Sequence, residues 1–239
     1  MRSFYYLFFQ NILCKQACIH PQLLLKNERH IGNHLIESPH LDNKFIAFQQ
    51  NSKLSSVANK LYERKDNGMG KIVFCQYKKE MTHLKNILQS SGMSVNLIDS
   101  NHTSKQKHVL LKGGSIPENH SIKELPIEIS KHINSFLVTD VTILQIQSSC
   151  EGLNLQDTFS EVYFVAPSWN PSVEAQAIAR CHRIGQKNQV HVFRFYMEPF
   201  KQSDFPTDDL EIHIDNMDQY ILKKQKFKNK LANNFYHAI

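Results

Sequence analysis

The sequence of 239 residues lacks the features that mark several common classes of protein. No stretch reaches the eighteen or so apolar residues that a membrane-spanning helix requires. The aromatic run at 4–9 follows a single basic residue, Arg2, and is shorter than the core of a typical signal peptide. Five cysteines make an odd number without regular spacing, which predicts reduced thiols rather than a disulfide framework. These absences predict an intracellular protein without a membrane segment.

The sequence motifs of many small-molecule enzymes are also missing. We find no nucleophile elbow, no dinucleotide-binding fingerprint and no cluster of metal ligands. Cys14, Cys18 and His20 stand close together, but no second pair lies at a suitable distance, and a structural zinc needs four ligands. We therefore predict no metal site on this chain.

The chain further lacks the phosphate-binding loop Gly-x-x-x-x-Gly-Lys-[Ser/Thr], whose backbone amides and lysine cradle a triphosphate. Gly70 and Lys71 match its end, but Ile72 follows them and no glycine stands five residues before Gly70. An Asp-Glu-x-His sequence, which could hold magnesium, is absent too. ATP bound to this chain would therefore need phosphate and magnesium ligands from elsewhere.

What the sequence does contain is a core and a basic balance of charge. Its hydrophobic fraction of 41% is enough for one domain of ordinary size with appendages. The formal charge of +6 favours partners that carry phosphate, although it identifies none of them.

The most informative segment, 168–186, predicts a helix that carries two arginines. Asn170 can cap the helix, Pro171 suits its first position, and Gly185 can end it. The segment at 161–167 before it and the segment at 189–196 after it are apolar and predict strands.

Gln176, Arg180 and Arg183 follow one another at spacings of four and three, which place side chains on one face of a helix. Two guanidinium groups and an amide on one face suit a polyphosphate, because guanidinium forks match phosphate oxygens. The alternative is that the two arginines only complement the dipole at the end of the helix.

Strands and helices alternate along the middle of the chain, which predicts an α/β fold with a parallel sheet covered on both faces. The remaining expected strands are 71–77, 94–99, 109–111 and 141–147. Helices are expected at 51–61, 81–92 and 122–133, a linker at 64–70 and an exposed loop at 100–107. Residues 1–50 are expected to be helical and irregular.

The C-terminal region is acidic at 204–218 and carries five lysines at 222–230. The lysines fall on an expected helix with an apolar stripe formed by Met217, Tyr220, Ile221, Phe227 and Leu231. One interpretation is a brace helix whose lysines lie near DNA. The other is a solvated basic face.

Three motifs in order carry a resemblance to a known family: Glu151-Gly-Leu-Asn-Leu-Gln156, Trp169-Asn-Pro171 and the pattern Gln-Ala-x-x-Arg-x-x-Arg-x-Gly-Gln that begins at Gln176. This part of the chain resembles the second motor lobe of the Swi/Snf-type DNA translocases of helicase superfamily two. The resemblance implies a RecA-like parallel sheet flanked by helices, with a helical entry at 1–69, the lobe at 70–200, and an acidic linker and basic helix at 201–239.

The resemblance also implies the roles of particular residues. Arg180 and Arg183 would act as catalytic arginine fingers that reach phosphates held by another lobe. The nucleotide-binding set would be Gln176, Gly152, Asn154, Arg180 and Arg183. The DNA-binding set would be Gln76, Tyr77, Ser148, Ser149, Trp169 and Asn170. The family usually has Ala-Gly-Gly where this chain has Ser148-Ser149-Cys150, and the lost glycines restrict the backbone of that loop. For Trp169, packing against the protein's own core is an equal alternative.

The implied activity is ATP-dependent translocation on double-stranded DNA, with ATP and Mg²⁺ as cofactors and the Mg²⁺ ligands on a first RecA-like lobe. That lobe would be encoded upstream or on a second chain, so the chain is expected to be a fragment, a split gene or half of a two-chain motor, inactive alone. DNA contacts would be independent of sequence. The expected location is the nucleus, or a viral replication site, because 145–147 and 151–156 are similar to translocases of large DNA viruses. The alternative function is a non-catalytic module that binds DNA or a partner and regulates it.

Overall fold

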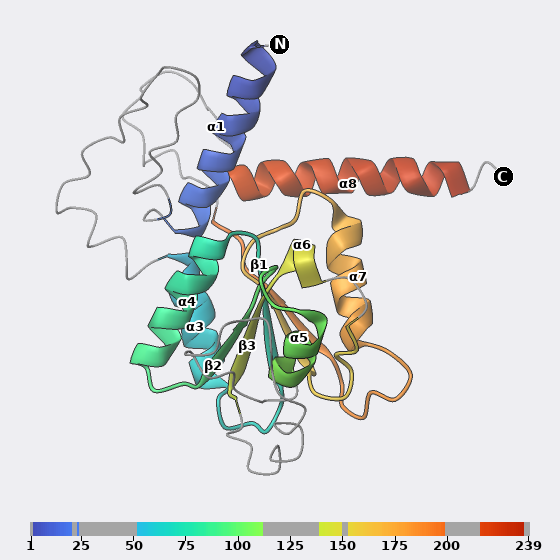
Figure 1. Ribbon diagram of the computed structural model, residues 1–239. Helices are drawn as coiled ribbons and strands as arrows, with labels where there is room; N and C mark the ends of the chain where they lie inside the picture. Colours follow the sequence, from blue (N-terminus) through green and yellow to red (C-terminus); the bar gives the residue numbers. More distant parts are fainter. Residues whose placement is uncertain are drawn as a thin grey trace. The chain divides into compact units, whose positions relative to one another are not determined.

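Figure 1 shows a computed structural model of the chain. The structure describes residues 2–20, 23, 52–111, 139–149, 153–198 and 216–236. The chain divides into two compact units. The first consists of residues 1–56, 165–171 and 194–239, and the second of residues 57–164 and 172–193. Each unit is described by itself. The division into 1–69, 70–200 and 201–239 stays a prediction.

The second unit is built on a five-stranded sheet in the order β2-β3-β1-β4-β5. The strands are β1 (Lys71–Cys75), β2 (Val95–Ile98), β3 (Val141–Gln145), β4 (Glu161–Phe164) and β5 (His191–Arg194). The pairs β1–β3, β1–β4 and β2–β3 are parallel. The predicted α/β fold, with a parallel sheet flanked by helices, is confirmed.

Helices cover both faces of the sheet because the side chains of its strands alternate in direction. Figure 1 draws α4 (Lys78–Ser90) on one side, and α5 (Ser104–Leu111) with α7 (Pro171–Cys181) on the other. Ile72 and Phe74 of β1 belong to the core cluster on the α5 and α7 side, where the rings of Phe74 and Phe164 stack 5.4 Å apart.

The register brings the carboxyl ends of the central strands to one edge. Cys75 of β1 pairs with Gln145 of β3, and Phe74 pairs with Phe164 of β4. The segments that follow these strands therefore leave the sheet at the same edge, where parallel α/β sheets bind their ligands. After β3 the chain forms the short helix α6 (Ile146–Ser149), whereas the sequence predicted that the strand continues to residue 147.

The helix α4 follows from its sequence pattern. Met81, Leu84 and Leu88 recur at spacings of three and four and are buried. Glu80 accepts hydrogen bonds at Oε2 from the backbone N–H groups of residues 76 and 77, which satisfies two donors at the start of the helix. Gly92, with a φ of 75°, ends the helix as predicted.

The segment at 109–111 was predicted as a strand, and this prediction is wrong. It is the last turn of α5, which begins at Ser104, so the loop predicted at 100–107 is also too long. The Thr103 hydroxyl accepts a hydrogen bond from Gln106 N, and Gln106 Oε1 accepts one from Thr103 N. This reciprocal pair is a capping box, and it marks the start of a helix in the sequence.

The described part of the first unit is mainly helical. It includes α1 (Arg2–Ile19), α8 (Met217–Tyr236) and the first turn of α3 (Lys53–Glu63). The helix predicted within 1–50 and the basic C-terminal helix are both present. On α8, Ile221 is buried, whereas Tyr220, Phe227 and Leu231 are exposed, so the apolar stripe is largely uncovered. The helix predicted at 122–133 and most of the acidic segment lie outside the described residues.

No helix in the described ranges combines the length and the apolar character needed to cross a membrane.

Candidate nucleotide and nucleic-acid site

The helix α7 has a buried face and a more exposed face, and Glu174 lies on the buried one. Ala177 and Cys181 are buried in the core, whereas Gln176 is exposed and Arg180 is half-buried. The helix ends at Cys181, four residues before Gly185. Arg183 is exposed in the turn that follows, so the prediction that it continues the same helical face is wrong. Gly185 has a φ of 102°, which belongs to that turn.

The end of α7 is hydrogen-bonded to the loop before β4. Arg183 Nη1 donates to Asn154 Oδ1 over 2.8 Å, and the backbone N–H of Leu155 donates to the carbonyl of Arg180 over 3.3 Å. The structure thus brings together three of the residues assigned to the nucleotide, Asn154, Arg180 and Arg183. Gly152 lies outside the described residues.

Gln186 is a second link between these segments, and the sequence analysis gave it no role. Its Nε2 donates to the carbonyls of Phe159 at 2.9 Å and Cys181 at 3.2 Å, while its Oε1 accepts from Asn188 N at 2.9 Å. All of its amide atoms are therefore used within the second unit. The sequence gives one indication of this role, because Gln186 is the last residue of the arginine motif.

Two buried thiols, Cys181 and Cys75, lie in the second unit. Burial raises the pKa of Cys181 to about 12, so its thiol stays protonated at neutral pH and packs as a small apolar group. Cys75, at the end of β1, has a pKa well above its usual value for the same reason, with the charge of Glu80 as a further cause.

Gln76 and Tyr77 follow β1 at the edge where the parallel strands end. Gln145 Nε2 donates to the carbonyl of Gln76 over 3.2 Å, which joins the ends of β1 and β3. Burial, and then the charge of Glu80, raise the pKa of Tyr77 to about 12. The phenol is thus neutral at physiological pH and could donate to a phosphate. Ser148 and Ser149 lie in α6, after β3.

Trp169 and Asn170 belong to the first unit. Asn170 is exposed. The half-buried Trp169 ring meets Tyr220 of α8 edge-on, with centroids 6.2 Å apart, and Lys15 Nζ lies 5.8 Å from its centroid. These contacts are those that the packing alternative expects. The role of Trp169 in DNA binding stays a prediction.

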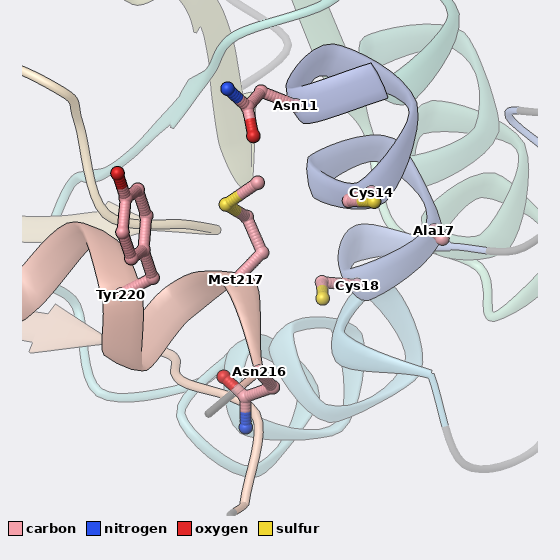
Figure 2. Close-up of a pocket in the computed structure, with 7 residues that line it drawn as sticks. All are labelled: Asn11, Cys14, Ala17, Cys18, Asn216, Met217 and Tyr220. Atoms are coloured by element: carbon pink, nitrogen blue, oxygen red, sulfur yellow. The ribbon is translucent and has the colours of Figure 1, made fainter. Parts of the chain in front are cut away.

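The first unit also contains a cavity of about 410 Å³ between α1 and α8. Figure 2 shows the residues that line it: Asn11, Cys14, Ala17, Cys18, Asn216, Met217 and Tyr220. None of them belongs to the predicted nucleotide or DNA sets. Burial raises the pKa of Cys18, so this thiol is also protonated at neutral pH.

Within the described ranges, no three His, Cys, Asp or Glu side chains gather in a way that could hold a metal ion. The groups that meet at the end of α7 are guanidinium and amide groups. They fit an anion, and they offer Mg²⁺ no carboxylate. The placement of the Mg²⁺ ligands on another lobe stays a prediction.

Residues 52–185, more than half of the chain, match the family described as the helicase conserved C-terminal domain. The chain belongs to this family. The predicted resemblance to Swi/Snf-type proteins is confirmed as well, because the relatives found include one that is described as SWI/SNF-related.

Two relatives of this helicase C-terminal domain illustrate the similarity. Helicase SWR1 of Kluyveromyces lactis is 29% identical over 166 residues, which cover 69% of this chain and 9% of the relative. The helicase-like transcription factor of Mus musculus is 24% identical over 218 residues, covering 87% of this chain and 18% of the relative. The chain therefore spans less than a fifth of the length of either protein.

A third relative, from Arabidopsis thaliana, is called a putative SWI/SNF-related matrix-associated actin-dependent regulator of chromatin subfamily A member 3-like 1. It is 28% identical over 187 residues, covering 77% of this chain and 17% of the relative. Among solved structures, the helicase C-terminal domain is similar to the C-terminal part of the Fun30 ATPase domain, with a TM-score of 0.46 and 18% identity. That match covers 61% of this chain and 41% of the other.

Proposed function

We propose that this chain is the second motor lobe of an ATP-dependent translocase on double-stranded DNA, of the chromatin-remodelling type. Arg180 and Arg183 are its catalytic residues, and they act on ATP held by a first lobe. The observation that supports this most is the hydrogen bond from Arg183 to Asn154, which orients an exposed guanidinium in the turn that follows α7.

The two arginines stabilise the negative charge that develops on the transferring phosphoryl group. A guanidinium is permanently charged and offers several hydrogen-bond donors in a fixed plane. The stabilisation that it gives to a phosphoryl group therefore depends on the orientation of that plane. Asn154 accepts a hydrogen bond from one N–H group of Arg183 and so holds the guanidinium in one orientation. The other donors of Arg183 can then bind the phosphate. Gln176 is exposed one turn before Arg180. In this proposal its amide N–H donates to the same anion.

ATP with Mg²⁺ supplies the free energy for translocation when it is bound between the lobes. This chain contributes positive charge and amide donors to that site. The phosphate-binding loop and the Mg²⁺ ligands belong to the first lobe, in the same polypeptide or in trans. The chain alone accordingly hydrolyses little ATP.

DNA binds at the edge where the parallel strands end. Gln76 and Tyr77 follow β1, Ser148 and Ser149 follow β3, and their hydroxyl and amide groups are suited to phosphate oxygens. Such contacts read no bases, so binding is independent of sequence and weakens with salt. Trp169 and Asn170, in the first unit, are the other residues that we propose to contact DNA.

The expected place of action is the nucleus. Its support comes from relatives in yeast, plant and mouse, one of them described as a regulator of chromatin. Whether the substrate is naked DNA or a protein–DNA complex depends on the whole motor protein.

A non-catalytic module that binds DNA or a partner motor and regulates it is the second candidate. The lack of a phosphate-binding loop in the sequence favours it. The two candidates differ in one respect: only the motor lobe needs Arg180 and Arg183 for its effect on a first lobe.

The deciding experiment combines the chain with a first lobe that carries a phosphate-binding loop, and measures ATP hydrolysis with and without duplex DNA. We expect DNA-stimulated hydrolysis that Arg183→Lys reduces by roughly three orders of magnitude. Lys187→Ala, at an exposed lysine four residues later, is the matched control and should leave the rate nearly unchanged. If Arg183→Lys keeps the rate within about twofold, far less than an arginine finger contributes, the proposal fails. DNA binding that survives Arg180→Ala and Arg183→Ala, with no hydrolysis, would support the regulatory module.

A further inference from the structure

One face of α8 in the first unit carries large apolar side chains that are exposed. Tyr220, Phe227 and Leu231 are 40%, 61% and 42% exposed, whereas Ile221 is fully buried. The helix therefore packs within its own unit, where it contacts α1, through a different face. The exposed apolar side chains are not the ones that hold α8 in place.

These side chains follow the spacing of a coiled-coil seam. The steps from Tyr220 to Lys224, Phe227 and Leu231 are four, three and four residues, which is the alternation of d and a positions in a heptad repeat. We call these four residues the α8 seam. Lys224 Nζ lies 5.3 Å from the centroid of the Tyr220 ring, so the stem of this lysine follows the seam. Side chains at such spacings line one face of a helix and can interlock with a second helix.

Lysines stand at the positions that flank the seam. Lys223 and Lys230 fall at g positions and Lys228 at an e position, and all three are exposed. After Asp218, α8 contains five lysines and no acidic residue. Among the residues that the structure describes, no carboxylate forms a salt bridge with Lys228 or Lys230. Lys228 donates one hydrogen bond to the carbonyl of Trp169, and an ammonium group has two further donors.

The combination of an apolar seam with basic flanks favours one kind of partner. A second copy of α8 would place lysines opposite lysines, and like charges across an interface oppose binding. Duplex DNA would satisfy the lysines, but its phosphate backbone offers no apolar surface to the seam. A helix with apolar residues at a and d and glutamates at e and g satisfies both features.

We propose that the α8 seam binds an acidic amphipathic helix of a partner protein. Phe227 and Leu231 insert between the apolar side chains of the partner. The flanking lysines pair with its glutamates. Lys224 interrupts the seam, and a lysine at an a position sets the register, because it is unfavourable without an acidic residue opposite it. This inference goes beyond the proposed function and does not depend on the ATP site.

The first test measures binding of a fluorescein-labelled peptide to the 239-residue chain by fluorescence anisotropy. The peptide is a synthetic helix of three heptads with leucine at a and d and glutamate at e and g. We expect saturable binding that Phe227→Ser weakens about tenfold, because a large aromatic group is lost from the centre of the interface. Tyr62→Ser, at an exposed aromatic residue of α3, is the matched control and should bind as the wild type does.

The second test concerns charge. Lys230→Glu should weaken binding about fivefold at low salt and less at high salt, because screening reduces the repulsion between the new carboxylate and the peptide. In a set of peptides that each carry one lysine in place of a glutamate, at least one should bind Lys230→Glu more tightly than the wild type. Asn229→Glu adds a negative charge at an exposed f position, outside the seam, and should change the affinity by less than about twofold.

Four outcomes would overturn the inference. The first is no binding of the peptide, or equal binding by Phe227→Ser and Tyr62→Ser. The second is self-association of the chain in sedimentation that Phe227→Ser abolishes and the peptide does not reduce, which assigns the seam to a second copy. The third is duplex DNA that displaces the peptide and binds Phe227→Ser as tightly as the wild type, which makes α8 a DNA surface. The fourth is a first motor lobe that displaces the peptide and requires Phe227, which makes the seam an internal contact of the motor.

Discussion

Arg64 and Glu161, 97 residues apart in sequence, are joined in the second unit by two hydrogen bonds. Arg64 Nε lies 2.7 Å and Nη2 2.5 Å from Glu161 Oε1. Asn67 Nδ2 donates to the same oxygen, and the Tyr163 hydroxyl donates to Glu161 Oε2, each over 2.7 Å. The linker before β1 is thereby fixed to the first residue of β4, at the end of the strands opposite the candidate site.

The Glu161 carboxylate makes stability depend on pH. Burial raises its pKa, but the hydrogen bonds from Arg64, Tyr163 and Asn67 outweigh burial, and the net pKa lies below the usual 4.5. A lowered pKa in the folded state means that the stabilisation is complete above about 4.5, and is lost as the pH falls through the folded value. We expect Glu161→Gln to lower the free energy of unfolding at pH 7 by about 1–3 kcal/mol.

The measurement is urea unfolding of wild type and Glu161→Gln at pH 7, 5 and 3.5. The difference between the two should be largest at pH 7 and should shrink between pH 5 and 3.5. Glu63→Gln, at an exposed glutamate of α3, is the control and should show a small, nearly constant difference. A Glu161→Gln difference of equal size at all three pH values would contradict the assignment of a lowered pKa.

Gly70 is required by a close approach of two backbones. A Cβ at this position would lie 1.8 Å from the carbonyl oxygen of Thr158, and that carbonyl belongs to the backbone, which cannot turn aside as a side chain can. The carbonyl of Gly70 also accepts the backbone N–H groups of Ser160 and Glu161. Gly70→Ala should therefore cost about 3 kcal/mol or more of unfolding free energy.

Gly68→Ala is the matched comparison for Gly70→Ala. Gly68 has a φ of 70°, but nothing lies within 4 Å of its Cβ position. Only conformational strain remains, worth about 1–2 kcal/mol. Chemical denaturation of the two variants should rank Gly70→Ala as the more damaging. If Gly68→Ala lowered the unfolding free energy more than Gly70→Ala, the backbone at residue 158 would be able to move aside with little loss of stability.

In the first unit, Lys53 and Asp218 form a buried ion pair with 2.5 Å between Nζ and Oδ2. Asp218 Oδ2 also accepts the backbone N–H of Met197 over 2.8 Å. Asp218→Asn leaves the lysine charge buried without its partner, and such changes cost about 3–5 kcal/mol. Lys53→Met combined with Asp218→Leu removes both charges and should recover part of the loss. Thermal unfolding that ranks the double variant below Asp218→Asn would contradict this account.

Several parts of the fold could be predicted from local patterns because those patterns are short. The apolar run from Lys71 and the alternation of strands with helices are enough to indicate a parallel sheet. The segment at 109–111 was misread because three apolar residues fit either element, and the capping box between Thr103 and Gln106 was overlooked. Arg183 was placed on the helix because its spacing is helical, although the helix ends two residues earlier.

The contacts that assemble the candidate site could not be predicted in the same way. The pair Arg183–Asn154 spans 29 residues, and Gln186 donates to the carbonyl of Phe159, which lies 27 residues before it. A sequence contains no local sign of such pairs, since each residue type suits many partners. Motif resemblance named Arg183 and Asn154 but assigned nothing to Gln186, because a resemblance transfers a role only to a position whose role in the family is known.

Gln186 provides the last prediction, because it joins the end of α7 to the loop before β4. A glutamate has the same shape but cannot donate when ionised, so Gln186→Glu would place a carboxylate against the carbonyls of Phe159 and Cys181. Unsatisfied acceptors at two part-buried carbonyls should cost about 1–3 kcal/mol. The matched control is Gln189→Glu, which adds the same charge at an exposed position of the following loop.

The expected result of Gln186→Glu is a lower urea midpoint at pH 7, together with a loss of hydrolysis in the two-lobe assay, while Gln189→Glu resembles the wild type. The carboxylate of Gln186→Glu faces two carbonyls, which raises its pKa in the folded state. The stability deficit should therefore shrink as the pH falls from 7 toward about 4.5, because the carboxyl group protonates in the folded state and regains an O–H donor. That recovery separates the loss of a donor from a packing defect, since a packing defect does not depend on the pH. A deficit that stays constant from pH 7 to pH 4 would mean that Gln186 holds these segments by its shape alone.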